Sequence, residues 1–181
     1  MPKKHLVVGV DWYGPYDLKT AHKVAKDYGK GGLYLCLGKL KGQHSRRLQY
    51  VGKSNNGLAS RLNEDHHKLS EVQRERKLWL GVVGTGGVPG KRKLLTPQAL
   101  HLAEWAIAHF LDLRLNDRLR LRRPPEPVTV LSRWWHSDYE TPHLHRPHPG
   151  WPDLIDYLGP YYRARLVWFG QRQKVIPPAQ L

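Results

Sequence analysis

The sequence predicts an α+β protein with a small three-stranded antiparallel sheet, flanked by helices and extended at both ends. Three apolar runs of strand length are bounded by Gly, Lys or Ser, at residues 33–37, 48–51 and 78–83. Segments with helical spacing of apolar residues precede, separate and follow these runs. We therefore expect a central core at residues 32–123, an N-terminal extension at 1–31 that packs on it, and a C-terminal extension at 124–181.

Three segments have the features of helices. Asp17 can cap a helix that reaches about residue 28, where a glycine-rich stretch ends it. The apolar residues of segment 58–72 approximate one stripe, which also favours a helix. Thr96 followed by Pro97 is a typical helix start, with a capping side chain and then proline at the first helical position.

The composition changes after an arginine-rich segment that ends at Pro124-Pro125. Residues 124–160 hold most of the prolines, together with several histidines and tryptophans. We expect an irregular wrap or a small appended lobe here, with a last strand at 164–170 that returns to the sheet.

The charge of the chain indicates its class of partner. Thirty Lys and Arg against fifteen Asp and Glu give a formal net charge of +15, and a phosphate backbone is the typical partner of a compact basic protein. No apolar run approaches the roughly 20 residues of a membrane span. The N-terminal apolar stretch is too short for a signal peptide, and Cys36, the one cysteine, can form no intrachain disulfide. We expect a cytoplasmic protein without a membrane partner.

Two of the strand-like runs carry glycine and tyrosine in matching settings. Gly32-Leu33-Tyr34 begins the first run, and Tyr50-Val51-Gly52 ends the second. Between Lys39 and Arg61 the chain has no acidic residue. Because neighbouring antiparallel strands can put side chains on one face, we expect the two phenols to lie together.

These tripeptides resemble the signature of the GIY-YIG nuclease superfamily, and the resemblance covers residues 32 to about 116. Arg61, Glu104 and Asn116 follow in the order of the family's arginine, metal-binding glutamate and asparagine. The resemblance implies a metal-dependent endonuclease that hydrolyses phosphodiester bonds in DNA, with RNA not excluded as a partner.

The resemblance also implies a role for each residue. Glu104 would bind Mg²⁺, for which Mn²⁺ would substitute, since Mg²⁺ keeps most of its waters and needs few carboxylates. Arg61 would stabilise the scissile phosphate with its planar set of donors. Tyr34 would assist the attacking water and Tyr50 would orient the water or the phosphate. A free phenol has a pKa near 10, so we expect Lys53 and the metal to lower it.

Two positions stay open. The family commonly has histidine or tyrosine four residues after its arginine, where this chain has Asp65 followed by His66 and His67. Five residues along a regular helix advance about 140° beyond a full turn, so His66 would reach the face of Arg61 only on a distorted helix. Asn116 is either a member of the site or only a residue that ties down the backbone.

Cations of the loops between strands are expected to contact DNA: Lys39, Lys41, Arg46, Arg47, Lys91, Arg92 and Lys93. The chain length and the two extensions favour a restriction-like enzyme, which as a homodimer would cut both strands of a symmetric site. The alternatives are a single-strand or structure-specific nuclease, and a non-catalytic DNA- or RNA-binding module on a nuclease scaffold.

Overall fold

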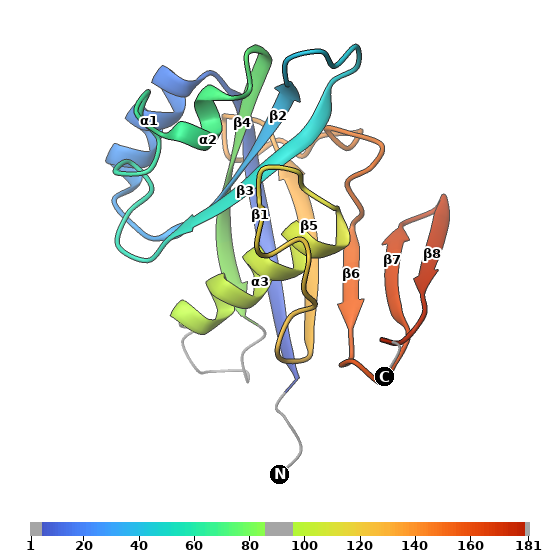
Figure 1. Cartoon of the computed structure of the whole chain (residues 1–181). Helices are drawn as coiled ribbons and strands as arrows, with labels where there is room; N and C mark the ends of the chain where they lie inside the picture. Colours follow the sequence, from blue (N-terminus) through green and yellow to red (C-terminus); the bar gives the residue numbers. More distant parts are fainter. Residues whose placement is uncertain (1–4, 86–95, 180–181) are drawn as a thin grey trace, which may run out of the picture.

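The computed structural model describes residues 5–85 and 96–179. Within these ranges it has eight strands and three helices (Figure 1). The strands are β1 (Leu6–Tyr16), β2 (Gly32–Lys39), β3 (Arg47–Ser54), β4 (Arg74–Thr85), β5 (Val128–Trp135), β6 (Leu154–Tyr157), β7 (Ala164–Trp168) and β8 (Arg172–Ile176). The helices are α1 (Leu18–Tyr28), α2 (His67–Ser70) and α3 (Pro97–Phe110).

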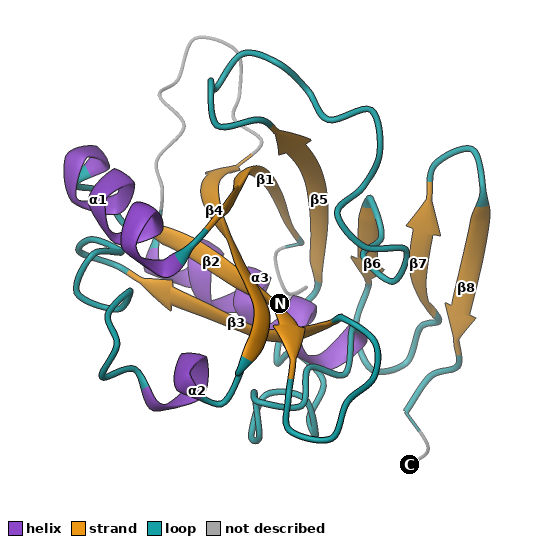
Figure 2. Cartoon of the chain, turned by 90° about the horizontal axis from the view of Figure 1, so that it is seen from above, coloured by secondary structure: helices purple, strands orange, loops and turns teal. Residues whose placement is uncertain are grey.

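All the strands belong to one mixed sheet in the order β3-β2-β4-β1-β5-β6-β7-β8. Every neighbouring pair is antiparallel except β1 and β5, which run parallel. The sheet curls into a half-barrel, so that β6, β7 and β8 stand away from α1 and α2 (Figure 2). The prediction of a small three-stranded sheet was therefore wrong, although β3, β2 and β4 are the three strands that it named.

The N-terminal strand explains part of this error. β1 lies between β4 and β5 and pairs with both along most of its length. Its buried side chains alternate at Val8, Val10 and Trp12, which is the period of a strand. The Gly14-Pro15 pair does not end the strand, because the register with β4 shifts between Tyr13 and Tyr16 and leaves Pro15 outside the ladder.

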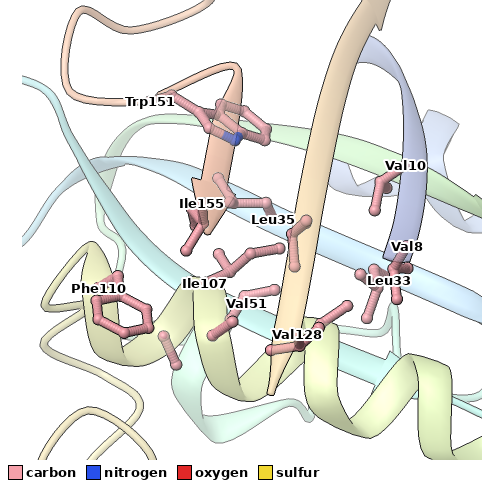
Figure 3. Close-up of a cluster of buried hydrophobic side chains, with 14 of the residues drawn as sticks. Val8, Val10, Leu33, Leu35, Val51, Ile107, Phe110, Val128, Trp151 and Ile155 are labelled. Carbon is pink, nitrogen blue, oxygen red and sulfur yellow. The ribbon is translucent and has the colours of Figure 1, made fainter. Parts of the chain in front are cut away.

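The C-terminal extension is not an irregular wrap, since it contributes four of the eight strands. Its strands share one hydrophobic core with the middle of the chain and with β1 (Figure 3). In that core Val128 and Ile155 from the extension belong to the same cluster as Leu35 of β2 and Ile107 of α3. The pairing of β1 with β5 joins residues about 120 positions apart, which no local sequence pattern reveals.

Two of the predicted helices are confirmed, with the predicted caps. The Asp17 carboxylate accepts the Thr20 N–H at 2.8 Å at the start of α1, and Gly29 ends this helix with φ of 65°. The Thr96 hydroxyl accepts the Ala99 N–H at 3.1 Å at the start of α3. Among the described residues no helix is long and apolar enough to cross a membrane.

The predicted helix over residues 58–72 was wrong. Residues 57–66 form successive turns, and only the four residues of α2 are helical. The apolar residues of the segment, which include Leu58 and Leu69, are nevertheless buried in a second cluster with α1 and one face of β2 and β4. Burial was thus predicted correctly, but a chain of turns achieves it. His66 caps α2 after the polar stretch that precedes it.

Candidate active site

The glycines of the two tripeptides allow close approaches that no other residue permits. Gly52 of β3 lies opposite Tyr34 of β2. A Cβ atom at Gly52 would lie 2.3 Å from Cζ of Tyr34, so the phenol ring covers the place where a side chain would stand. A Cβ atom at Gly32 would lie 2.6 Å from the backbone oxygen of Gly81 on β4. Gly52 therefore determines how Tyr34 lies against β3, and Gly32 allows β2 to approach β4.

Tyr34, Tyr50 and His66 form a compact group, here called the ring cluster. Ring centroids are 5.9 Å apart for the two tyrosines, and those of His66 are 5.9 Å from Tyr34 and 5.4 Å from Tyr50. Tyr34 is 1% exposed, whereas Tyr50 and His66 are half-buried. His66 is the histidine that contacts the tyrosines, while His67 is exposed and stacks on His66.

The turns after β3 bring His66 to the tyrosines. The Tyr34 hydroxyl oxygen lies 2.8 Å from Nε2 of His66. The Leu69 N–H donates to Nδ1 of His66 at 3.4 Å, because this ring caps α2. Nδ1 is thus an acceptor and the proton of the neutral imidazole is on Nε2, from which it is donated to Tyr34. The hydroxyl proton of Tyr34 is then free to be donated to Tyr50.

The two phenols differ in their electrostatic setting. Burial raises the pKa of Tyr34 far above its ordinary value, and the neighbouring Tyr50 raises it further. Burial also raises the pKa of Tyr50, but the neighbouring Tyr34 hydroxyl and then the charges of Arg61 and Lys68 act in the opposite direction. Burial lowers the pKa of His66, which favours its neutral form. Tyr50 is therefore the phenol of the pair in which a phenolate is better supported.

Glu104 comes to this site from α3. Its side chain is 12% exposed, and burial raises its pKa to about 7. Lys53 and Arg61 lower that pKa, so both cations lie near the carboxylate, although neither forms an ion pair within 4.0 Å among the described residues. A carboxylate already held out of water can accept a divalent metal ion at little further desolvation cost.

His101 is a neighbour of Glu104 that our sequence analysis missed. Its Nδ1 lies 3.9 Å from Oε2 of Glu104. Burial, and then the charge of Lys53, lower the pKa of His101 and favour a neutral imidazole. The available signal was the three-residue spacing, which puts both side chains on one face of α3.

Arg61 lies in the turn segment between β3 and α2 and is exposed. Its backbone N–H donates to the Leu58 carbonyl at 2.9 Å, within the turn that replaces the predicted helix. The guanidinium charge lowers the pKa of both tyrosines and of Glu104. Arg61 is thus near enough for its charge to act on both tyrosines and on the carboxylate, and its side chain is exposed.

Asn116 holds the strand that carries Tyr50. Its amide is buried, and its Oδ1 accepts the Val51 N–H at 2.9 Å while its Nδ2 donates to the Val51 carbonyl at 2.7 Å. β3 is the edge of the sheet, so these two bonds replace the missing neighbour strand at Val51. Of the two alternatives for Asn116, these bonds support the one in which it fixes the backbone next to Tyr50.

The cations expected to contact DNA lie in different surroundings. Lys39, at the end of β2, forms an ion pair with Glu75 of the neighbouring strand β4. Lys41 is exposed in the loop between β2 and β3. Arg46 and Arg47 are exposed and line a cavity at the start of β3. The other three cations of this prediction, Lys91, Arg92 and Lys93, lie outside the described residues.

No larger metal centre accompanies Glu104 in the described part of the chain, where no three His, Cys, Asp or Glu side chains come together to hold an ion. The arrangement consists of one largely buried carboxylate, a histidine beside it, two cations and a pair of neighbouring phenols. Comparison with known proteins found no match, whether among protein-family models, curated proteins or solved structures. The likeness to GIY-YIG nucleases therefore rests on these residues alone.

Proposed function

We propose that this chain is a metal-dependent endonuclease of the GIY-YIG type that hydrolyses phosphodiester bonds in DNA. The observation that carries the proposal is the convergence of the ring cluster, Arg61 and Glu104. These residues come from β2, β3, two turns and α3, and the electrostatics of each responds to the others. A scaffold used only for binding would have no need of a buried carboxylate beside linked phenols.

The geometry supports Tyr50, rather than Tyr34, as the phenol that meets the attacking water. Tyr50 is the more exposed of the two. Tyr34 lies beside Tyr50, with ring centroids 5.9 Å apart, and its hydroxyl oxygen lies 2.8 Å from Nε2 of His66, so it can steady a phenolate on its neighbour. In this proposal Tyr50 takes a proton from water, and Tyr34 and His66 are positioning residues. Arg61 balances the charge that develops on the phosphate oxygens.

Glu104 fits a divalent cation, which as a Lewis acid would polarise the phosphate and supply charge neutralisation. Its carboxylate is buried at a cost that raises its pKa to about 7, and a cation would offset this cost. His101, 3.9 Å away, is the nearest side chain that could share in holding the ion or its waters. Lys53 completes the positive surroundings of the carboxylate.

The test is cleavage of supercoiled plasmid, with single-stranded DNA and RNA as parallel substrates, in Mg²⁺ or in EDTA. Wild type and a Glu104→Ala variant are compared, and Glu140→Ala, which removes an exposed carboxylate, is the matched control. Discrete fragments that require Mg²⁺ and Glu104 support the proposal and its restriction-like form. Cleavage of only a single-stranded substrate overturns the restriction role. Retarded but intact nucleic acid, equal for all three proteins, overturns the nuclease and leaves a binding module.

A further inference from the structure

A basic cavity lies at the start of β3, on the side of the strand where α3 ends. It has a volume of about 670 Å³ and is lined by three segments of the chain. These are residues 45–49 at the start of β3, residues 111–114 after α3, and residues 148–150 of the loop before β6. Arg46, Arg47 and Arg114 supply its positive charge.

The cavity continues toward the C-terminal hairpin. A second cavity, of about 550 Å³, shares Leu111, Asp112 and Gly150 with the first. Its far wall is the β7–β8 pair, which lies at the opposite side of the molecule from α1 and α2 (Figure 1). The two cavities together form what we call the basic groove, whose cationic or histidine side chains are Arg46, Arg47, Arg114, His148, Arg172 and Lys174.

The hairpin register directs two cations into this groove. Lys174 lies opposite Leu166, and Arg172 lies opposite Trp168. Opposite residues of an antiparallel pair share a face, so both cations are on the face whose other members, Leu166 and Trp168, are buried in the core. The Arg172 guanidinium lies 4.3 Å from the Trp168 ring centroid and donates to the Pro149 carbonyl at 3.0 Å.

The positive charge of the groove is not balanced from within. Of the described residues that line it, only Asp112 is acidic, and its carboxylate accepts from Arg120 at 2.9 Å. Among the described residues, Arg47, Arg114 and Lys174 have no carboxylate within 4.0 Å. Exposed cations lined up without counter-charge favour an extended anion.

The walls of the groove are tied together around this charge. Nε2 of His148 lies 3.2 Å from the Arg46 carbonyl oxygen, and the Gly150 N–H donates to Nδ1 of the same ring at 3.0 Å. Nδ1 is thus the acceptor, and Nε2–H donates to Arg46. His148 therefore joins the loop before β6 to the start of β3, so the groove is preformed rather than assembled by its ligand.

We propose that the basic groove binds the phosphate backbone of duplex DNA beyond the bond that is cut; this rests on the proposed function. Arg47 precedes Tyr50 by three residues on β3, which is about 10 Å along a strand. Arg114 precedes Asn116, which fixes the same strand at Val51. A backbone bound in the groove therefore lies beside the start of the strand that carries Tyr50.

The aromatic residues of the groove favour a duplex over a single strand. Phe110 and Trp168 line it, but they are only 7% and 5% exposed. Proteins that bind single strands offer aromatic faces on which unpaired bases stack, and these two rings offer none. The groove contacts backbone charge alone, which is the sequence-independent part of duplex recognition.

The experiment is DNA binding by the full chain in EDTA, which prevents cleavage, followed as fluorescence anisotropy at several salt concentrations. The probe is a duplex of about two helical turns, roughly 20 base pairs, with a single strand of the same sequence in parallel. The groove variant is Arg47→Ala/Arg114→Ala/Lys174→Ala. The matched control is Lys19→Ala/Lys23→Ala/Arg165→Ala, which removes three exposed cations from α1 and from the outer face of β7.

We expect the groove variant to bind the duplex roughly 10- to 100-fold more weakly, with a salt slope smaller by about 0.9 for each lost phosphate contact. The control should stay close to wild type, and both variants should melt like wild type because the changed side chains are exposed.

Four results would contradict the groove. Equal losses in both variants would mean that only net charge matters, and equal retention would mean that the groove does not meet DNA. A larger loss for the single strand than for the duplex would assign the groove to unpaired nucleic acid. A groove variant that keeps its DNA affinity but self-associates would mean that these cations only prevent the edge strand β8 from pairing with another chain. If wild type binds no nucleic acid at all, the proposed function fails together with the groove. If wild type binds DNA and the groove variant binds it equally well, only the groove fails.

Discussion

The Tyr34 hydroxyl oxygen lies 2.8 Å from Nε2 of His66, although the two residues are 32 positions apart. This contact exists because residues 57–66 form turns, whereas a regular helix would have turned His66 away. It also fixes the proton between His66 and Tyr34, and it leaves the Tyr34 hydroxyl proton free for the neighbouring Tyr50. The relative roles of the two tyrosines follow from this arrangement.

Tyr50→Phe should lower the cleavage rate about 10²- to 10⁴-fold, since it removes the group proposed to take the proton from water. Tyr34→Phe should cost less, because this phenol acts through its neighbour. It should also move the rising limb of the pH–rate profile to higher pH, since Tyr50 acts as a base and loss of the neighbouring Tyr34 hydroxyl raises the pKa of Tyr50. The check is single-turnover cleavage over a pH series. Equal losses in both variants with unshifted profiles would contradict these roles.

Gly52→Ala should displace the Tyr34 ring, because the new Cβ would lie 2.3 Å from its Cζ atom. We expect a loss of about 1–3 kcal/mol in unfolding free energy, together with reduced cleavage. Gly84→Ala is the matched control, since a Cβ on this strand glycine meets nothing within 4 Å. Urea titration of both variants measures the difference. A Gly52→Ala protein as stable and as active as the control would mean that the ring position does not matter.

Asn116→Ala should destabilise the protein by about 2–4 kcal/mol, because it removes two hydrogen bonds and leaves the buried N–H and carbonyl of Val51 without partners. Asn63→Ala removes an exposed amide that bonds Ser60 and should change little. Chemical denaturation gives the stability, and cleavage at a temperature where both variants are folded gives the activity. Loss of activity without loss of stability would instead indicate a direct contact of Asn116 with substrate.

Glu104→Gln should stabilise the metal-free protein at neutral and alkaline pH. The folded pKa of about 7 lies above the ordinary value of 4.5, so the folded state holds this proton more tightly. The cost of ionisation is absent below pH 4.5 and grows until pH exceeds about 7, where it approaches about 3 kcal/mol.

Melting temperatures of wild type and Glu104→Gln should therefore agree near pH 4.5 and diverge above pH 7, the variant being higher. Mg²⁺ should raise the melting temperature of wild type and leave the variant unchanged, because only the ionised carboxylate attracts the cation. Glu140→Gln, at an exposed position, controls for net charge. A variant no more stable than wild type at high pH, or equally stabilised by Mg²⁺, would contradict the assignment of Glu104.

The sequence predicted the approach of the two tyrosines and the helix that carries Glu104, although its prediction of the fold was wrong. Tyr34 and Tyr50 meet because the alternation of neighbouring strands is a local rule, and Glu104 belongs to a helix whose start was marked by Thr96 and Pro97. His66 was left open because the rule applied to it assumed a regular helix. The apolar stripe that suggested this helix reports burial, and a series of turns buries Leu58 and Leu69 equally well.

The larger sheet escaped prediction because its pairings are long-range. β1 pairs with β5 through residues such as Val10 and Ser132, and no local feature of either sequence indicates which strand it pairs with. The prolines around β5 and β6 hid the second half of the sheet, since they indicate loops when considered locally. The basic groove was invisible for the same reason, because the hairpin that completes it approaches Arg114 only in the folded chain.

We propose above that this site hydrolyses DNA with a metal held by Glu104. The most direct test of this proposal is single-turnover cleavage of a labelled DNA duplex by wild type and Glu104→Gln, in Mg²⁺ and in EDTA. We expect cleavage only by wild type in Mg²⁺. The DNA should stay intact in the other three reactions, and the variant should still bind the duplex. Cleavage that persists in the Glu104→Gln protein, or DNA that stays intact with wild type in Mg²⁺, would contradict it.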